Sequence, residues 1–219
     1  MGRYRTHVRD VAVCVTAGAA VSLAAALVLD AAHPSGGWLT VAAAAIGVTP
    51  AALAAIAVLR RRPPFTTPAD RVTLGRTSLA CGCAAMTALV LLGPAPARDY
   101  WLFAISVPTL LLDGVDGQVA RRTGTATEEG ALLDMQVDAG VLVVLSLAVA
   151  TAIGWWAVLI GAMRYLYVVA SWMRPALATP LPRSRFRVAV AGAQGGVLAG
   201  ALAPFVPTAL ATAAVARTG

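Results

Sequence analysis

The chain has 219 residues, of which 59% are hydrophobic and 12% are charged, and its mean hydropathy is +0.78. Soluble domains carry about 25% charged residues, so this composition excludes an ordinary soluble enzyme and indicates a polytopic membrane protein. The net charge of +7 comes from arginines alone, and nearly all of them lie in short loops. That distribution indicates membrane topology and anionic lipid headgroups, and it argues against nucleic-acid binding, for which the chain has no basic domain.

Residues 1–62 contain two apolar segments that we predict to be transmembrane helices. The first, residues 11–29, follows three arginines and resembles a secretory signal peptide at first sight. Its apolar run exceeds the roughly 7–15 residues of a signal, so an uncleaved helix is favoured over a cleaved one. The second span, residues 39–59, ends at the run Arg60 to Arg62, which is a strong cytoplasmic marker.

Residues 63–219 contain the remaining predicted spans. The stretch 66–76 has a proline at its likely first helical turn and mixes polar with apolar residues, so we expect it to lie at the membrane surface before the chain turns inward. An eighth candidate near the C-terminus rises only about 14 Å, which is too short for a bilayer. The third to eighth spans are predicted at 79–92, 100–120, 130–153, 155–172, 188–203 and 208–216.

The arginines give an independent check on this all-α arrangement. With eight spans both ends of the chain face the cytoplasm, and 15 of the 17 arginines fall on that side. The exceptions are Arg98 in an outer loop and Arg164 within the sixth span. Because short cytoplasmic loops are rich in arginine, the agreement supports a multi-pass protein of the cell membrane. It also places residues 111–139 at the cytoplasmic edge.

Four aspartates stand in apolar surroundings where the fourth and fifth spans meet: Asp113, Asp116, Asp134 and Asp138. Residues three or four apart share a helix face, and the short polar link between the pairs makes the two helices antiparallel neighbours. Four converging carboxylates need cations to remain ionised. Their oxygens suit Mg²⁺ or Mn²⁺, and a pair of such ions promotes displacement at phosphorus. The alternative, acidic helix ends in solvated loops, is disfavoured because carboxylates flanked by apolar helix are usually functional.

Small and basic residues flank the aspartates at regular spacing. Gly117 lies four residues after Asp113, and Gly130 lies four before Asp134. Each glycine leaves room for a phosphate or base to approach the backbone. Arg121 offers a planar fork that suits a phosphate group.

Together these residues form the pattern D-x-x-D-G-x-x-A-R, eight further residues, and G-x-x-x-D-x-x-x-D. The pattern resembles the signature of the CDP-alcohol phosphotransferases (CDP-alcohol phosphatidyltransferases), integral membrane enzymes of phospholipid synthesis. Eight specified positions make this a much more specific signal than a short glycine motif. The positions are Asp113, Asp116, Gly117, Ala120, Arg121, Gly130, Asp134 and Asp138.

The resemblance implies a homodimer and a six-helix core within 63–219. Residues 1–62 lie outside the resemblance, and they are either an accessory pair of helices or only an aid to packing and insertion. It also implies transfer of a phosphatidyl group from CDP-diacylglycerol to a polar alcohol, with release of CMP. Asp113, Asp116 and Asp134 would hold two Mg²⁺ or Mn²⁺ ions. Asp138 would touch one ion and accept the proton of the acceptor hydroxyl as the catalytic residue.

The same resemblance assigns Gly117, Arg121 and Thr127 to the CDP moiety. Thr127 can equally belong to the network that starts the fifth helix, where Thr125 has capping-box spacing to Glu128. The family often has Asn-x-x-Thr before its first core helix, and this chain has Asp70 and Thr73 at those positions. An aspartate there loses a donor and adds negative charge near a diphosphate.

Two arginines are candidates for binding the acceptor. Arg164 lies inside a predicted span, where an arginine is costly in lipid and should face a polar cavity. It would bind an acceptor phosphate, as in glycerol 3-phosphate or an inositol phosphate, or else pair with an aspartate of the motif. Arg183 lies in a cytoplasmic loop and would add to a phosphate-binding mouth, or serve only as a topology charge.

Two other functions remain open on the sequence. A small ion-coupled transporter also uses carboxylates within the membrane, but such proteins tend to place charges near the midplane, on broken helices or in inverted repeats. The charges here cluster at one interface. A catalytically inactive member of the family is the other alternative, and the intact signature argues against it.

Overall fold

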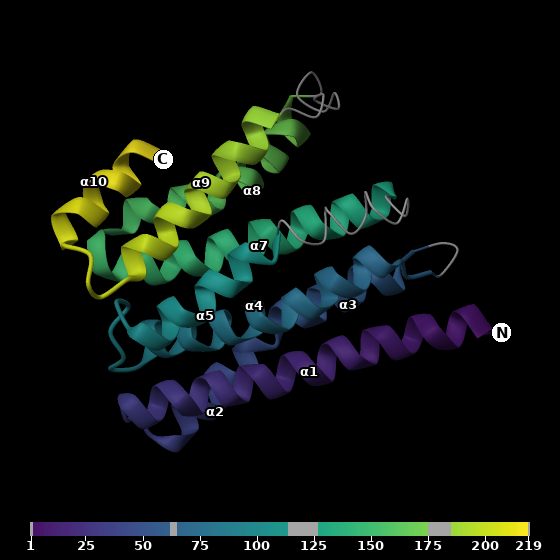
Figure 1. Cartoon of the computed structure of the whole chain (residues 1–219), viewed down its shortest axis with the longest axis horizontal. Coiled ribbons are helices and arrows are strands. Elements are labelled where there is room, and N and C mark those ends of the chain that lie inside the picture. The colour runs from purple at the N-terminus through teal and green to yellow at the C-terminus, as the bar shows by residue number, and fades with distance from the viewer. Residues whose placement is uncertain (1, 62–64, 114–126, 175–184, 219) are drawn as a thin grey trace.

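The computed structural model describes residues 2–61, 65–113, 127–174 and 185–218. Within these ranges the regular elements are helices, with no strand, which confirms the predicted all-α class. The helices run along a common long axis and form an elongated bundle (Figure 1). Five of them are long and apolar enough to cross a membrane, consistent with the predicted polytopic protein.

The N-terminal unit consists of α1 (Gly2–Ala32), α2 (Gly37–Gly47) and α3 (Thr49–Leu59). The second predicted span is therefore two helices, divided at Val48, although together they are long enough to cross a membrane. The cause is Pro50, which has no N–H to donate to the carbonyl four residues earlier and crowds that turn.

The central element is α4 (Pro68–Leu92), which packs against α1, α2, α3, α5 and α7. The expected surface segment with a turn after residue 76 is wrong, because those residues belong to one uninterrupted helix with the third span. Thr67 and Asp70 form a capping box at its start, and Pro68 sits in the first turn. No proline follows before Leu92, so nothing breaks the helix.

The next helices alternate in direction along the bundle. Asp99 caps α5 (Tyr100–Leu111), and Thr127 caps α7 (Glu128–Ile153). Gly154 adopts φ +131° and turns the chain into the short helix η1 (Trp155–Ala157), which leads into α8 (Val158–Met173). Such a φ favours glycine, so a side chain at the turn would be strained. The last third of the predicted fourth span, residues 114–120, lies outside the described residues.

The last two helices are α9 (Arg185–Leu202) and α10 (Thr208–Thr218). The Gln194 side chain donates to the carbonyl of Thr218, so α10 reaches back only to the middle of α9. Eleven residues rise about 16 Å, which is less than a bilayer. The described α10 therefore does not complete the crossing that would return residue 218 to the side of the N-terminus.

Small residues allow the N-terminal unit to lie close against α4. A Cβ atom at Gly47 would come within 2.6 Å of Ala85 Cβ and 2.8 Å of the Cys81 carbonyl oxygen. A Cβ at Gly18 would come within 2.9 Å of Ala51 Cβ and 3.0 Å of Cys81 Sγ. These distances are too short for real contacts, so glycine at both positions is what permits the crossing of α1 and α2 with α4.

The two ends of the bundle differ in chemistry. At one end lie the starts of α1, α4 and α7 and the end of α3, and we call this the aspartate end (Figure 1). At the opposite end, exposed aromatic rings mark the starts of α2, α5 and η1: Trp38, Tyr100, Trp101 and Trp155. Aromatic side chains of this kind are enriched where a membrane meets water.

Candidate functional site

Three aspartate side chains converge at the aspartate end. Asp113 follows the last turn of α5, and Asp134 and Asp138 lie one turn apart on α7. One carboxylate oxygen of each lies within 4.8 Å of the other two. The side chains are between 32% and 41% exposed, so a cation or a polar substrate can reach them.

A buried arginine joins these carboxylates. Arg76 comes from α4, and its side chain is only 2% exposed. Its Nη1 donates to Asp113 Oδ1 at 2.6 Å, and its Nη2 lies 2.7 Å from an oxygen of both Asp134 and Asp138. One guanidinium balances only one of three carboxylate charges. The remaining negative charge favours binding of hard cations by the same oxygens.

The starts of α4 and α7 meet beside this cluster. Thr127 accepts a hydrogen bond from the backbone N–H of Gly130 at 3.0 Å and so caps α7. A Cβ at Gly130 would lie 3.0 Å from Thr127 Oγ1 and 3.3 Å from Asp70 Oδ1. Gly130 therefore leaves the space in which Asp70 and Thr127 approach each other. Because Asp134 lies one turn after Gly130 on the same face, this contact adjoins the carboxylate cluster.

Comparison with known proteins identifies the family. A family model described as CDP-alcohol phosphatidyltransferase matches residues 66–218. The chain belongs to this family. Its members transfer phosphatidyl groups in phospholipid biosynthesis, act on CDP-alcohols in membranes, and generally use divalent metals. Searches of curated proteins and of solved structures give no match.

The family match begins at residue 66, so Asp70 lies within it, whereas its main ion-pair partner, Arg61, lies just before it. Asp70 is 1% exposed, and Arg61 from the end of α3 donates to both of its oxygens, at 2.8 and 3.0 Å. Thr67 donates to the same carboxylate from its backbone and from its hydroxyl, at 2.7 and 2.9 Å. A ligand that contacted Asp70 directly would have to displace one of these partners. Thr73 is also buried, at 3% exposure.

Several residues predicted from the signature of this phosphatidyltransferase family lie outside the described residues: Asp116, Gly117, Ala120, Arg121 and Arg183. The described structure therefore brings together the first aspartate of the motif and its last two. It also places Thr127 and Gly130 next to them.

Arg164 lies on α8, half-buried, and makes no ion pair with any residue of the described ranges. One turn earlier, a Cβ at Gly161 would press on Ser146, Val143 and the Leu142 carbonyl, so this face of α8 is turned toward α7. Since α8 runs antiparallel to α7, Arg164 lies about one turn closer to the aspartate end than Gly161. That is about the level of Gly140, less than one turn of α7 from Asp138.

Two functional candidates were missed by the sequence analysis. Arg76 was taken as the end of a surface segment, although an arginine within an apolar helix of sufficient length to cross a membrane is itself a signal. Arg61 belongs to a run of three arginines that was interpreted only as a topology marker. Nothing in its local sequence distinguishes it from Arg60, because its partners come from other helices.

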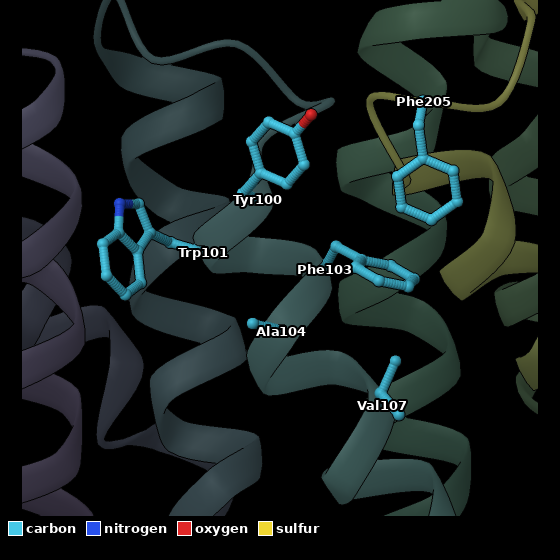
Figure 2. Close-up of a pocket in the computed structure, with 6 residues that line it drawn as sticks. All are labelled: Tyr100, Trp101, Phe103, Ala104, Val107 and Phe205. Carbon is cyan, nitrogen blue, oxygen red and sulfur yellow. The ribbon is translucent and has the colours of Figure 1, made fainter.

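An apolar groove of about 470 Å³ lies at the other end of the bundle (Figure 2). Its lining contains no charged residue: Tyr100, Trp101, Phe103, Ala104, Val107 and Phe205. The rings of Phe103 and Phe205 meet edge to face, with centroids 5.4 Å apart. This chemistry suits hydrocarbon chains of lipids and offers nothing to a charged headgroup.

Proposed function

We propose that this protein transfers the phosphatidyl group of CDP-diacylglycerol to a polar alcohol and releases CMP. The observation that carries the proposal is the convergence of three carboxylates, with oxygens within 4.8 Å of one another, in a chain that belongs to the CDP-alcohol phosphatidyltransferase family. The convergence is on neighbouring helices at one end of a membrane bundle, where a headgroup in water and acyl chains in lipid can both be accommodated.

The residues fit Mg²⁺ or Mn²⁺. All the ligands are carboxylate oxygens, and the surplus of negative charge around Arg76 remains to be balanced. We propose that Asp113, Asp116, Asp134 and Asp138 hold two such ions. When bound, the ions supply positive charge that stabilises the diphosphate while the bond to CMP breaks.

The protein's own side chains would position and deprotonate the acceptor. The acceptor hydroxyl oxygen forms a bond to the phosphorus that carries diacylglycerol, and the bond from that phosphorus to the oxygen of CMP breaks. The hydroxyl proton passes to Asp138, whose one oxygen is held 2.7 Å from Arg76 Nη2. This contact aims the carboxylate, and CMP leaves with the negative charge of the broken bond.

The placement of the site supports a lipid donor. The acyl chains would remain among the exposed apolar side chains of the bundle, and the cytidine head would enter from the aspartate end, where Thr127 lies. We propose that Gly117 and Arg121 also bind the CDP moiety. We propose that this end faces the cytoplasm at the cell membrane and that the protein is a homodimer. The excess of arginines expected on that side supports the orientation.

The acceptor is proposed to carry a phosphate, as glycerol 3-phosphate or an inositol phosphate does. Arg164 supports this, because it is a charged residue of a helix long and apolar enough to cross a membrane, it lies near the α7-facing side of α8 less than one turn from the level of Asp138, and it makes no ion pair within the described residues. Arg183, which lies between α8 and α9 in the sequence, is proposed as a second contact.

The test is an assay of CMP release by membranes that contain the protein. CDP-diacylglycerol is supplied with Mg²⁺ or Mn²⁺ and with glycerol 3-phosphate, inositol phosphate, serine or phosphatidylglycerol in turn. We expect CMP with a phosphorylated acceptor, and none after chelation of the metal. Absence of CMP with every acceptor would contradict the proposal and favour a transporter or an inactive family member.

A further inference from the structure

The N-terminal unit contacts the start of α4 at two places. Asp10 of α1 accepts hydrogen bonds from Thr66 Oγ1 at 2.7 Å and from Arg71 Nε at 2.9 Å. Arg61, which lies two residues after the end of α3, makes the two-pronged ion pair with Asp70. Arg71 is half-exposed, so its pair with Asp10 is screened by solvent, whereas the side chains of Arg61 and Asp70 are 5% and 1% exposed.

Arg61 also reaches a third helix. Its Nη2 donates to the backbone carbonyl of Glu129 at 3.1 Å, in the first turn of α7. The ring of Phe65 lies 5.2 Å from its guanidinium carbon and completes the enclosure. One side chain of the N-terminal unit therefore fixes the start of α4 relative to the start of α7.

This junction adjoins the carboxylate cluster. Asp70 Oδ1 lies 3.3 Å from the position of a Cβ on Gly130, and Asp134 follows Gly130 by one turn of α7. Arg76 follows Asp70 on α4 and holds the cluster from the other side. A shift at the junction would move Asp134 relative to Arg76.

The charge of Asp70 is a second way in which Arg61 affects the site. A carboxylate at Asp70 without Arg61 would be a buried, uncompensated negative charge at the entrance to a site that already has a surplus of carboxylates. An anionic diphosphate entering from this end would be repelled by it. With Arg61 in place, the pair is neutral.

We infer that Arg61, which lies outside the matched family region, is a positioning residue that makes the N-terminal unit a working part of the site: it neutralises Asp70 and locks α7 against α4 so that an anionic nucleotide can bind. The inference rests on the proposed function, because the ligand is the nucleotide of that reaction.

The test uses the full chain in detergent and a double-mutant cycle of Arg61→Met, Asp70→Asn and both together. CMP binding is measured by the thermal shift that CMP produces with Mn²⁺, and KM and kcat for CDP-diacylglycerol are measured by CMP release. Arg61→Met should weaken CMP binding and raise KM at least tenfold, with a smaller change in kcat. Adding Asp70→Asn should restore most of the loss, because the unpaired charge is removed.

A merely structural role predicts the opposite pattern, in which the double variant binds CMP no better than Arg61→Met. That result, or CMP binding by Arg61→Met equal to that of the unmodified chain, would overturn the inference and leave the proposed function intact. An unmodified chain that neither binds nor releases CMP would overturn both.

Two further variants guard against loss of folding. Arg61→Lys keeps the charge but cannot reach both Asp70 oxygens and the Glu129 carbonyl together. Its KM should therefore lie between that of Arg61→Met and that of the unmodified chain. Arg98→Met is the matched control: Arg98 also joins helices, through Thr208 and the Ala203 carbonyl, but at the opposite end. It should lower the melting temperature with KM unchanged, and a KM increase equal to that of Arg61→Lys would contradict the inference.

Discussion

Two buried arginines at the same end of the bundle have opposite charge balances. Arg76 contacts three carboxylates that are each about one-third exposed or more, so the cluster keeps a net negative charge. Arg61 contacts one carboxylate that is 1% exposed, so the pair is neutral and closed to water. The first arrangement attracts further cations, and the second can only hold helices together and remove a charge.

The difference shows how a membrane protein can use the same residue type in two ways. Where carboxylates outnumber guanidinium groups and remain accessible, the structure favours metal binding and chemistry. Where the two are matched and buried, the pair fixes the position of its helices, and breaking it leaves a buried charge. Arg76 belongs to α4 and Arg61 pairs with Asp70 of the same helix, so the comparison can be tested with paired variants.

The largest expected effect is that of Asp138→Asn in the accessible cluster. The amide cannot accept the acceptor proton, so CMP release should fall by about 10²- to 10⁴-fold. CMP binding, measured by thermal shift, should remain largely intact. Asp99→Asn is the control, because Asp99 pairs with His33 away from the cluster and should leave CMP release unchanged. Equal loss of binding and turnover in Asp138→Asn would make Asp138 purely structural.

Arg76→Met should separate the two kinds of arginine most clearly. Without the guanidinium, Asp113, Asp134 and Asp138 repel one another. In the presence of a chelator, the free energy of unfolding should therefore fall by about 1–3 kcal/mol, a limited loss because the carboxylates are partly solvated. Mn²⁺ should then raise the melting temperature of this variant more than that of the unmodified chain, since metal competes for the same oxygens without a rival cation.

The comparison for that experiment is Arg61→Met, whose loss of stability should be nearly the same with chelator as with Mn²⁺. Melting temperatures in detergent over a range of Mn²⁺ concentrations provide the measurement. If Mn²⁺ stabilises both variants by the same increment, the proposed distinction between an open and a closed cluster is wrong.

The close contact of α2 with α4, on which the position of Arg61 depends, can be loosened by Gly47→Ala. The added Cβ would lie 2.6 Å from Ala85 Cβ and 2.8 Å from the Cys81 carbonyl oxygen, so overpacking should cost about 1–3 kcal/mol. Gly140→Ala is the matched control, because it meets nothing within 4 Å and should be neutral or stabilising by up to about 1 kcal/mol. Equal melting temperatures for the two would contradict the packing argument.

The smallest effect is expected for Thr127→Ala at the shared start of α7. Loss of the hydrogen bond from Gly130 N–H should cost about 1 kcal/mol, the usual value for an N-cap. Thr16→Ala is the control, because Thr16 is exposed on α1 and its hydroxyl bonds only within its own helix. It should change the free energy of unfolding by less than about 0.5 kcal/mol. A drop in CMP affinity beyond the stability loss would support the proposed contact of Thr127 with the nucleotide.

Much of the fold followed from local sequence. Apolar runs of sufficient length between arginines and prolines predicted the helices of an all-α membrane protein, because backbone groups in lipid must be satisfied within each helix. The signature around Asp113, Asp134 and Asp138 predicted the family, which the match over residues 66–218 confirms. Their assigned roles as metal ligands and base remain predictions. The helix boundaries were less predictable: Pro50 divides the second span into two helices, and residues 68–76 form one continuous helix with the third span.

Only the tertiary structure decided which charges meet. Arg76 is separated from Asp113 and Asp134 by 37 and 58 residues, and Arg61 is separated from the Glu129 carbonyl by 68. Spacing along one helix does not reveal which residues of different helices meet. Arg60 and Arg61 cannot be told apart in the sequence, because both belong to one basic run. The sequence by itself determined that Asp134 and Asp138 share a helix face and predicted that they meet Asp113, because helix periodicity is local. Which arginine neutralises which carboxylate depended on how α3, α4 and α7 pack.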